Sequence, residues 1–144
     1  MKSVPSSHRR LCSGAGILPV LVAIAATLLC LPQSHAQTEV PTGSALRKSL
    51  FELARPSVES EAGQKVLFEG SLKQLGEWAF FMGRIVSAKG AEIVPSGYSN
   101  GSVGILWVQR SGRWGLVTTE VGPTDLFYSE WPATYGVPRN LLGL

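Results

Sequence analysis

Apolar residues recur every three or four positions between residues 44 and 55, which is the spacing of one face of an α-helix. The pattern predicts a helix over residues 44–55, with an apolar stripe of Leu46, Leu50 and Leu53 and with Arg47, Lys48, Glu52 and Arg55 mostly on the other side. Ser44 is suited to cap this helix, because a serine hydroxyl at that position accepts a hydrogen bond from a free backbone N–H. Pro56 is expected to end or kink the helix. The alternative is a further helical turn through Val58 and Ala62 before Gly63, which suits a helix terminus.

Four later segments are rich in aromatic and β-branched residues and are bounded by turn residues, which is typical of strands. They are residues 66–73, 78–86, 102–110 and 114–121, and the last two are joined by Ser111-Gly112, a suitable hairpin turn. Each strand contains an interior glycine, which weakens a strand unless bending or close approach requires it. The four glycines are Gly70, Gly83, Gly104 and Gly115.

These elements predict an α+β domain over residues 44–144. The expected architecture is an N-terminal helix packed on a curved four-stranded antiparallel sheet, as in cystatin-like folds. A small half-open β-barrel is the alternative.

Both faces of the middle strands are apolar, since Phe80 and Met82 point one way while Phe81 and Ile85 point the other. One helix covers only one face of a sheet. The tail, residues 123–144, is rich in aromatic and leucine residues and is the expected cover for the second face. A second subunit is the other possible cover, so the chain is expected to be a monomer or a homodimer.

Two turns share the pattern glycine, charged residue, tryptophan: Gly76-Glu77-Trp78 and Gly112-Arg113-Trp114. Aromatic residues dominate core burial, so both tryptophans are interpreted as anchors for the strand that follows the turn. The alternative is a pair of exposed tryptophans that stack on a sugar or a peptide.

The first 36 residues have the three parts of an export signal. Lys2, Arg9 and Arg10 are followed by a charge-free apolar run over residues 17–31 and by Ser34-His35-Ala36, which fits cleavage before Gln37. The alternative, an uncleaved membrane anchor, is disfavoured because a spanning helix needs about 20 apolar residues. We therefore expect a periplasmic or secreted protein without stable membrane insertion, and a flexible lead over residues 37–43.

Composition then removes whole classes of chemistry. Both cysteines (Cys12 and Cys30) and both histidines (His8 and His35) lie in the expected signal, so the mature chain has neither residue type. This excludes disulfides, thiol nucleophiles, catalytic triads and zinc sites of Cys or His. No cofactor and no metal are predicted. The mature part also carries as many basic as acidic residues, scattered along its length, which does not suit nucleic-acid binding.

Several short motifs spread over the mature chain resemble a group of small exported bacterial proteins of uncharacterised function. These motifs are Arg47 through Arg55-Pro56, Val66-x-Phe68, Gly76-x-Trp78-Ala79-Phe80, Gly112-x-Trp114, Pro123-x-Asp125 and Tyr135-Gly136-Val137-Pro138-Arg139. The resemblance implies a bacterial periplasmic or secreted protein. It implies no activity and no catalytic residue.

Three residues are candidate binding residues: Tyr98, Trp107 and Asp125. Tyr98 lies in the longest irregular segment, residues 87–101, and Trp107 could belong to an exposed aromatic patch. Asp125 lies at the start of a predicted short helix, where a negative charge is favourable, and capping is the preferred interpretation over a catalytic role. No catalytic residue is assigned.

The expected function is that of a non-enzymatic binding or accessory domain, with a protein partner in the cell envelope. An inhibitor of an envelope hydrolase is a narrower version, suggested by fold analogy. The alternative is a small enzyme that uses carboxylates without histidine or cysteine.

Overall fold

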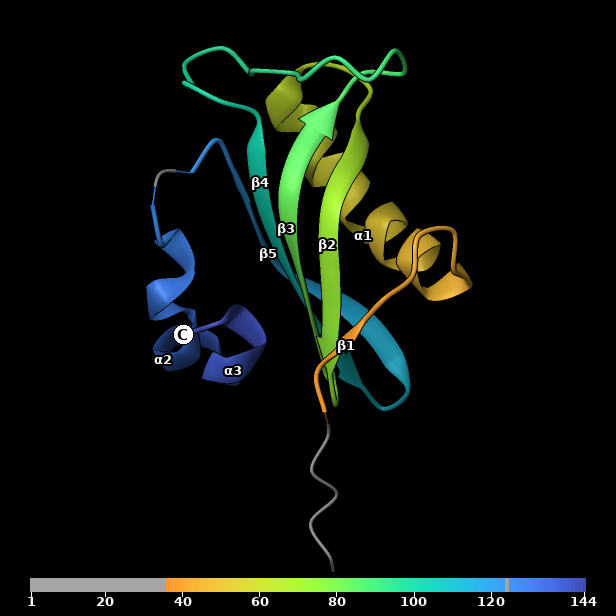
Figure 1. Ribbon diagram of the computed structural model, residues 1–144, viewed down its shortest axis with the longest axis vertical. Coiled ribbons are helices and arrows are strands. Elements are labelled where there is room, and N and C mark those ends of the chain that lie inside the picture. Colours follow the sequence, from red (N-terminus) through yellow and green to blue (C-terminus); the bar gives the residue numbers. More distant parts are fainter. Residues whose placement is uncertain (1–35, 124) are drawn as a thin grey trace, which may run out of the picture. The chain divides into compact units, whose positions relative to one another are not determined.

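The computed structural model describes residues 36–123 and 125–144, so the predicted export signal lies outside the described residues except for Ala36. Five antiparallel strands form one open sheet in chain order, with each strand beside the next (Figure 1). They are β1 (Thr38–Glu39), β2 (Leu67–Leu75), β3 (Trp78–Val86), β4 (Ser102–Arg110) and β5 (Arg113–Val121). The predicted α+β class is confirmed, and β1 adds a fifth strand to the four expected.

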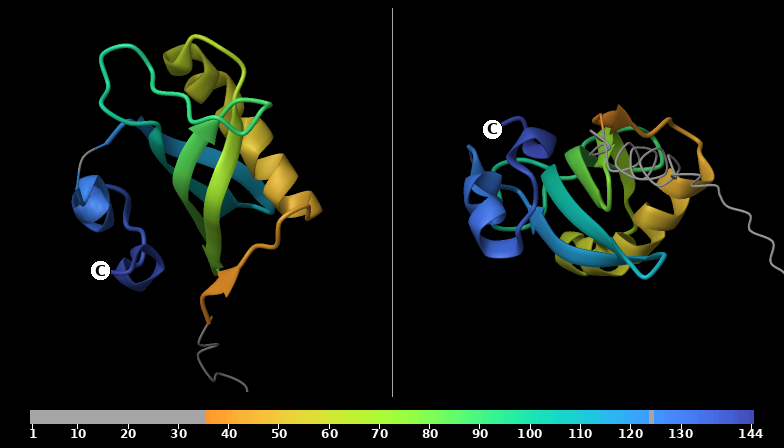
Figure 2. Two further views of the ribbon diagram at one scale, coloured as in Figure 1. Left: turned by 45° about the horizontal axis from the view of Figure 1, so that its top comes forward. Right: turned by 90° about the horizontal axis from the view of Figure 1, so that it is seen from below.

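Helix α1 (Ala45–Ala62) lies across one face of the sheet, and the short helices of the tail lie against the other (Figures 1 and 2). The tail elements are the 3-10 helix η1 (Phe127–Glu130), α2 (Trp131–Tyr135) and α3 (Arg139–Leu142). The sheet is therefore the middle layer between two apolar clusters.

Ser44 caps α1 as predicted, because its hydroxyl accepts a hydrogen bond from the Arg47 N–H at 3.2 Å. The helix does not end at Pro56 but continues to Ala62, and Gly63 ends it with a left-handed φ of 67°. Pro56 is exposed, whereas Ala54 and Val58 on either side of it are fully buried against the sheet. Packing on that side keeps the helix continuous past a residue that lacks one backbone hydrogen bond.

The buried face of α1 differs from the predicted leucine stripe. Leu50 and Phe51 are buried, but Leu53 is 43% exposed, so its place in the stripe is corrected. Arg47, expected mostly on the polar side, is buried in the helix-side core. The backbone carbonyl groups of Val40 and Gly70 accept hydrogen bonds from its guanidinium group, and a sequence pattern does not reveal such partners.

Residues 37–43, expected as a flexible lead, begin the domain. Thr38 and Glu39 pair with β2, and the Val40 side chain is buried in the helix-side core. The Glu39 carboxylate also accepts hydrogen bonds from the Ser71 hydroxyl at 2.8 Å and from the Leu72 N–H at 3.1 Å. This segment thus forms an edge of the sheet.

The strands bend strongly, as the interior glycines predicted (Figure 2). Gly70 and Gly83 face each other across β2 and β3, and a Cβ atom on Gly70 would lie 2.4 Å from the Met82 carbonyl oxygen. A side chain at this pair would push the two strands apart, so glycine permits their close approach.

The tail packs on part of the second face, which confirms the prediction that it belongs to the fold. Trp131, Leu141 and other tail residues form a buried cluster with side chains of β2, β3 and β4. The cluster consists of Leu75, Trp78, Phe80, Leu106, Trp131, Val137, Leu141 and Leu142.

The two turn tryptophans have different outcomes. Trp78 is only 7% exposed and belongs to the tail-side cluster, as expected of an anchor. Trp114 is partly buried and packs against the helix-side cluster.

Over residues 36–123 and 125–144, no helix has the length and apolar character that crossing a membrane requires.

Candidate functional site

The tail covers only part of the second sheet face. On that face, cross-strand pairing aligns Lys73 with Phe80 and Leu106, and the next row aligns Ser71 with Met82 and Gly104. Phe80 and Leu106 are buried beneath the tail, but Met82 on the central strand β3 remains 37% exposed. The exposed Met82 therefore lies where the tail stops covering this face of the sheet.

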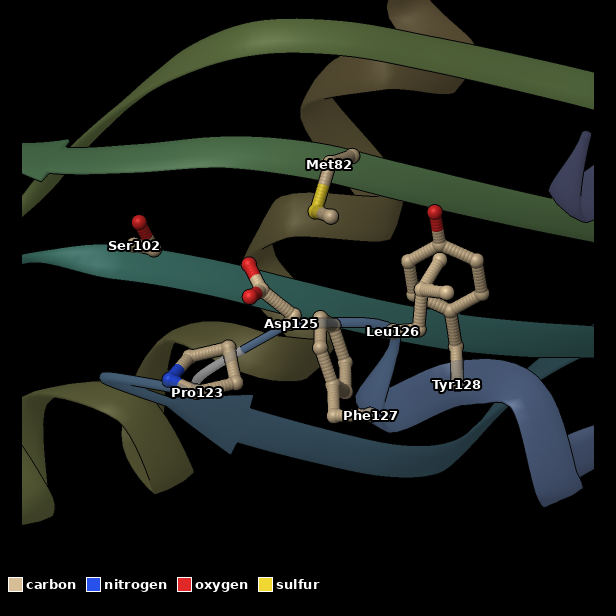
Figure 3. Close-up of a pocket in the computed structure, with 7 residues that line it drawn as sticks. All are labelled: Met82, Ser102, Pro123, Asp125, Leu126, Phe127 and Tyr128. Carbon is tan, nitrogen blue, oxygen red and sulfur yellow. The ribbon is translucent and has the colours of Figure 1, made fainter.

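A hollow of about 490 Å³ opens at this place, and we name it the sheet groove (Figure 3). Its lining residues are Met82, Ser102, Pro123, Asp125, Leu126, Phe127 and Tyr128. A second hollow of about 280 Å³ shares Met82 and Tyr128 with the sheet groove and extends toward Lys73 and Leu142. Together the two hollows offer an apolar floor with a carboxylate at one end and an ammonium group at the other.

Phe127 fixes one wall of the sheet groove. Its ring lies so close to Gly104 that a Cβ atom on this glycine would be 2.2 Å from the ring edge. Gly104 therefore provides the space in which the first turn of the tail settles on β4. Tyr128 comes next in η1 and stacks at a tilt on Phe80, with 5.4 Å between the ring centroids.

Leu126 lies on the rim in an unusual state. Its φ of 47° and ψ of 29° lie in the left-handed region of backbone conformation. This region is unfavourable for residues other than glycine, asparagine and aspartate. Its side chain is 58% exposed, although it is large and apolar. Backbone strain combined with an exposed apolar side chain is more common at binding sites than elsewhere on a surface.

Asp125 is a lining residue of the sheet groove and not a helix cap. The residue at the cap position of η1 is Leu126, and no side chain there accepts a capping hydrogen bond, so the capping interpretation is corrected. Figure 3 shows the Asp125 carboxylate turned toward the sheet, between Ser102 and Met82. The ion pairs formed by the described residues do not include Asp125, so its charge is available to a ligand.

Tyr98 is 42% exposed, and its ring packs over Gly122, one residue before Pro123 of the sheet groove. The segment that carries it, residues 87–101, is anchored to the sheet by the Ile93 N–H, which donates to the Ile85 carbonyl oxygen at 2.9 Å. Tyr98 thus lies beside the segment that leads into the groove, although it does not line the groove itself.

Trp107, the third sequence candidate, lies elsewhere. Its side chain is fully buried in the helix-side core, where its ring centroid is 6.1 Å from that of Phe51. The structure therefore does not bring Trp107 together with Asp125 and Tyr98, and an exposed role for Trp107 is corrected. Its indole N–H has no hydrogen-bond partner among the described residues.

Sequence reasoning missed Met82, Leu126 and Tyr128 as site residues. The prediction that Met82 shares a face with Phe80 is confirmed, but which face the tail covers, and where its cover stops, are tertiary features. The strained conformation of Leu126 had no signal in the sequence, because leucine is not a residue that favours a positive φ.

The carboxyl groups with altered acidity lie outside the sheet groove. Burial raises the pKa of Glu61 near the end of α1, and the nearby Glu120 carboxylate of β5 raises it further. The pKa of Glu59 is lowered, mainly by the hydrogen bond that it accepts from Lys65 at 2.9 Å. The described residues contain no cluster of three or more His, Cys, Asp or Glu side chains that could hold a metal ion.

Comparison with known proteins finds no matching family model, no matching curated protein and no matching solved structure. The geometry of the chain itself therefore carries the functional argument.

Proposed function

We propose that this protein is an exported binding or accessory domain without enzymatic activity, and that the sheet groove is its binding site for a protein partner in the cell envelope. The observation that carries the proposal is the exposed Met82 on a central strand, flanked by the strained and exposed Leu126. Binding sites of this kind combine apolar contact area with a few oriented polar groups.

The charge of the groove suggests which segment of a partner it accepts. Asp125 supplies one carboxylate beside the apolar floor, and Ser102 and Tyr128 supply hydroxyl groups to the lining. A peptide segment with a basic side chain next to an apolar one complements this arrangement. Such a segment would place its apolar side chain on Met82 and its cation beside Asp125.

The helix on a curved sheet also fits the cystatin-like kind of architecture, and a relationship to the small exported bacterial proteins named above is part of the proposal. An inhibitory role toward an envelope hydrolase is the narrower form of this function, by fold analogy alone.

A photo-crosslinking experiment tests the proposal. A photoreactive amino acid at Leu126 in the exported protein is expected to capture a partner in the envelope, and Asp125→Lys in the same chain is expected to abolish that capture. The matched control carries the photoreactive residue at Leu53, which is 43% exposed on α1. Equal products from both positions, or capture that Asp125→Lys leaves unchanged, would overturn the proposal.

One observation favours a carboxylate enzyme as the second candidate, namely the neighbouring pair Glu61 and Glu120 with the raised pKa of Glu61. Such pairs occur in acid-base catalysis. A hydrolase assay on envelope polymers with the Glu61→Gln and Glu120→Gln variants distinguishes the two candidates. Activity that both variants abolish would establish the enzyme.

A further inference from the structure

A third hollow, of about 290 Å³, lies between α1 and the start of β2, and it shares no lining residue with the two hollows on the other face of the sheet. Three of its lining residues are basic: Arg47, Lys48 and Arg55. The remaining lining residues are Gly43, Ser44, Phe51, Leu67 and Phe68. We name it the cationic hollow.

Arg47 is the unusual member of this set, because its side chain is buried. Its Nη1 donates to the Val40 carbonyl oxygen at 3.2 Å and its Nη2 donates to the Gly70 carbonyl oxygen at 2.7 Å. Its guanidinium carbon also lies 5.1 Å from the centroid of the Phe51 ring. These contacts satisfy two of its five N–H groups and orient it, but they supply no opposite charge.

The ion pairs of the described residues leave the Arg47 charge uncompensated. Glu52 and Glu59 both pair with Arg55, at 3.1 and 3.9 Å, and Arg47 and Lys48 take part in none of the ion pairs. A buried charge without a counter-ion is costly. An anion in the adjoining hollow would reduce that cost, and Lys48 would add a second, exposed cation to hold it.

The other wall of the hollow is aromatic. Phe51 and Phe68 are stacked with ring centroids 4.6 Å apart and planes 13° apart, and Arg55 lies over the Phe68 ring at 5.5 Å. An aromatic or apolar group beside the anionic group would therefore find contact area. Guanidinium groups bind carboxylates and phosphates strongly because both oxygens of such an anion can accept from them.

We propose that the cationic hollow is a second ligand site, which binds an anionic group, carboxylate or phosphate, attached to an aromatic or apolar body. Arg47 and Lys48 hold the anion, and Phe51 and Phe68 contact the attached body. The site goes beyond the proposed function. The sheet groove offers a carboxylate to a basic ligand, whereas the cationic hollow offers basic side chains to an anionic ligand on a separate part of the surface.

Nuclear magnetic resonance titration of the exported protein tests the site with four probes. Phenyl phosphate and benzoate carry both an anion and a ring, whereas inorganic phosphate lacks the ring and benzyl alcohol lacks the charge. We expect saturable shifts of the backbone N–H signals of Ser44, Arg47, Lys48 and Phe68 with the first two probes, and binding at least about threefold weaker with the other two. The tighter of the two aromatic anions identifies phosphate or carboxylate as the preferred group.

Variants separate a specific site from a general effect of charge. Lys48→Ala is expected to weaken phenyl phosphate and benzoate binding about three- to tenfold, whereas Lys89→Ala, which removes an exposed lysine outside the hollow, is expected to leave it unchanged. Lys48→Glu should abolish binding while the melting temperature without ligand stays near that of the parent. Absence of saturable shifts at Ser44 to Lys48, or equal weakening by the Lys48 and Lys89 variants, would overturn the proposal.

Discussion

Individual buried side chains connect several elements of this domain. Arg47 shows this best, because one buried guanidinium connects the lead at Val40, the bend of β2 at Gly70 and the aromatic core at Phe51. On the other face, Trp78 is buried in one cluster with Phe80 and Leu106 of the sheet and with residues of the tail. Both side chains are buried, so a substitution at either position removes contacts that join several elements.

The two turn tryptophans provide a direct comparison. Trp78→Ala is expected to lower the free energy of unfolding by about 3–5 kcal/mol, because it leaves a large cavity beneath the tail. Trp114→Ala is expected to cost about half as much, since Trp114 is only partly buried. Denaturant melts of both variants measure the difference. Near-neutral effects at both positions would contradict the anchor role and support stacking on a ligand instead.

Two glutamates near the end of α1 are expected to respond to pH in opposite directions. The pKa of Glu61 is raised in the folded chain, so ionisation of Glu61 destabilises the fold; this penalty is complete above the folded pKa and absent well below the ordinary value of 4.5. Glu61→Gln should therefore raise the free energy of unfolding at neutral pH, by less than about 1 kcal/mol because solvent screens the group.

The pKa of Glu59 is lowered, so its ionised form stabilises the fold above the ordinary value of 4.5, and this contribution is lost as the pH falls through the folded pKa. Glu59→Gln should destabilise the chain at neutral pH. Urea melts at neutral pH and near about pH 4 follow both variants, and both differences should shrink at the lower pH. Effects of the same sign at neutral pH would show that the environments of the two carboxyl groups are not as described.

At the scale of elements, the sequence predicted three of the four long strands to within one residue at each end, because turns mark their limits. Ser111 and Gly112 both have a positive φ, of 51° and 75°, which is the conformation that a two-residue hairpin turn requires. The end of α1 was less predictable. The expectation that Pro56 ends or kinks the helix rests on local backbone geometry and does not include the burial of Val58, which stabilises the helix beyond the proline. β1 was missed, since two residues carry no periodic pattern.

The candidate site was less predictable than the fold. Asp125 was identified by residue type, but its position in the sheet groove depends on where the tail crosses β4, which the contact of Phe127 with Gly104 fixes. Trp107 had the same aromatic character as an exposed contact residue, and only the register of β4 assigns it to the buried face.

Glycine substitutions test whether the tail is seated as described. Gly104→Ala is expected to destabilise the chain by about 1–3 kcal/mol, because its Cβ atom would overlap the Phe127 ring and displace η1. Gly115→Ala is the matched control in the next strand: its Cβ atom would meet only the Val108 carbonyl oxygen, at 3.9 Å. The control should be neutral or stabilising by up to about 1 kcal/mol. Thermal melts compare the two, and equal effects would argue against the Phe127 contact.

The whole domain is a sheet covered on both faces by segments from the two ends of the described chain. Because the helix-side core and the tail-side cluster share the sheet, losing either cover exposes apolar residues of the same strands. Soluble monomers rarely tolerate such a patch. The tail covers part of this face from within the same chain, and the incomplete cover leaves the sheet groove open.

Removing the tail is the test at this scale. A chain truncated after Gly122 lacks Trp131, Leu141 and the rest of the cover, so Trp78, Phe80 and Leu106 become accessible to solvent. We expect this chain to dimerise or aggregate, as measured by size-exclusion chromatography with light scattering. Leu141→Ala in the full chain should lower the free energy of unfolding by about 2–5 kcal/mol and leave the oligomeric state of the parent unchanged. Arg139→Ala at an exposed tail position should change the free energy of unfolding by less than about 0.5 kcal/mol. A truncated chain that stays monomeric, soluble and fully folded would show that the second face needs no cover. The sheet groove could then not be explained as a gap in such a cover.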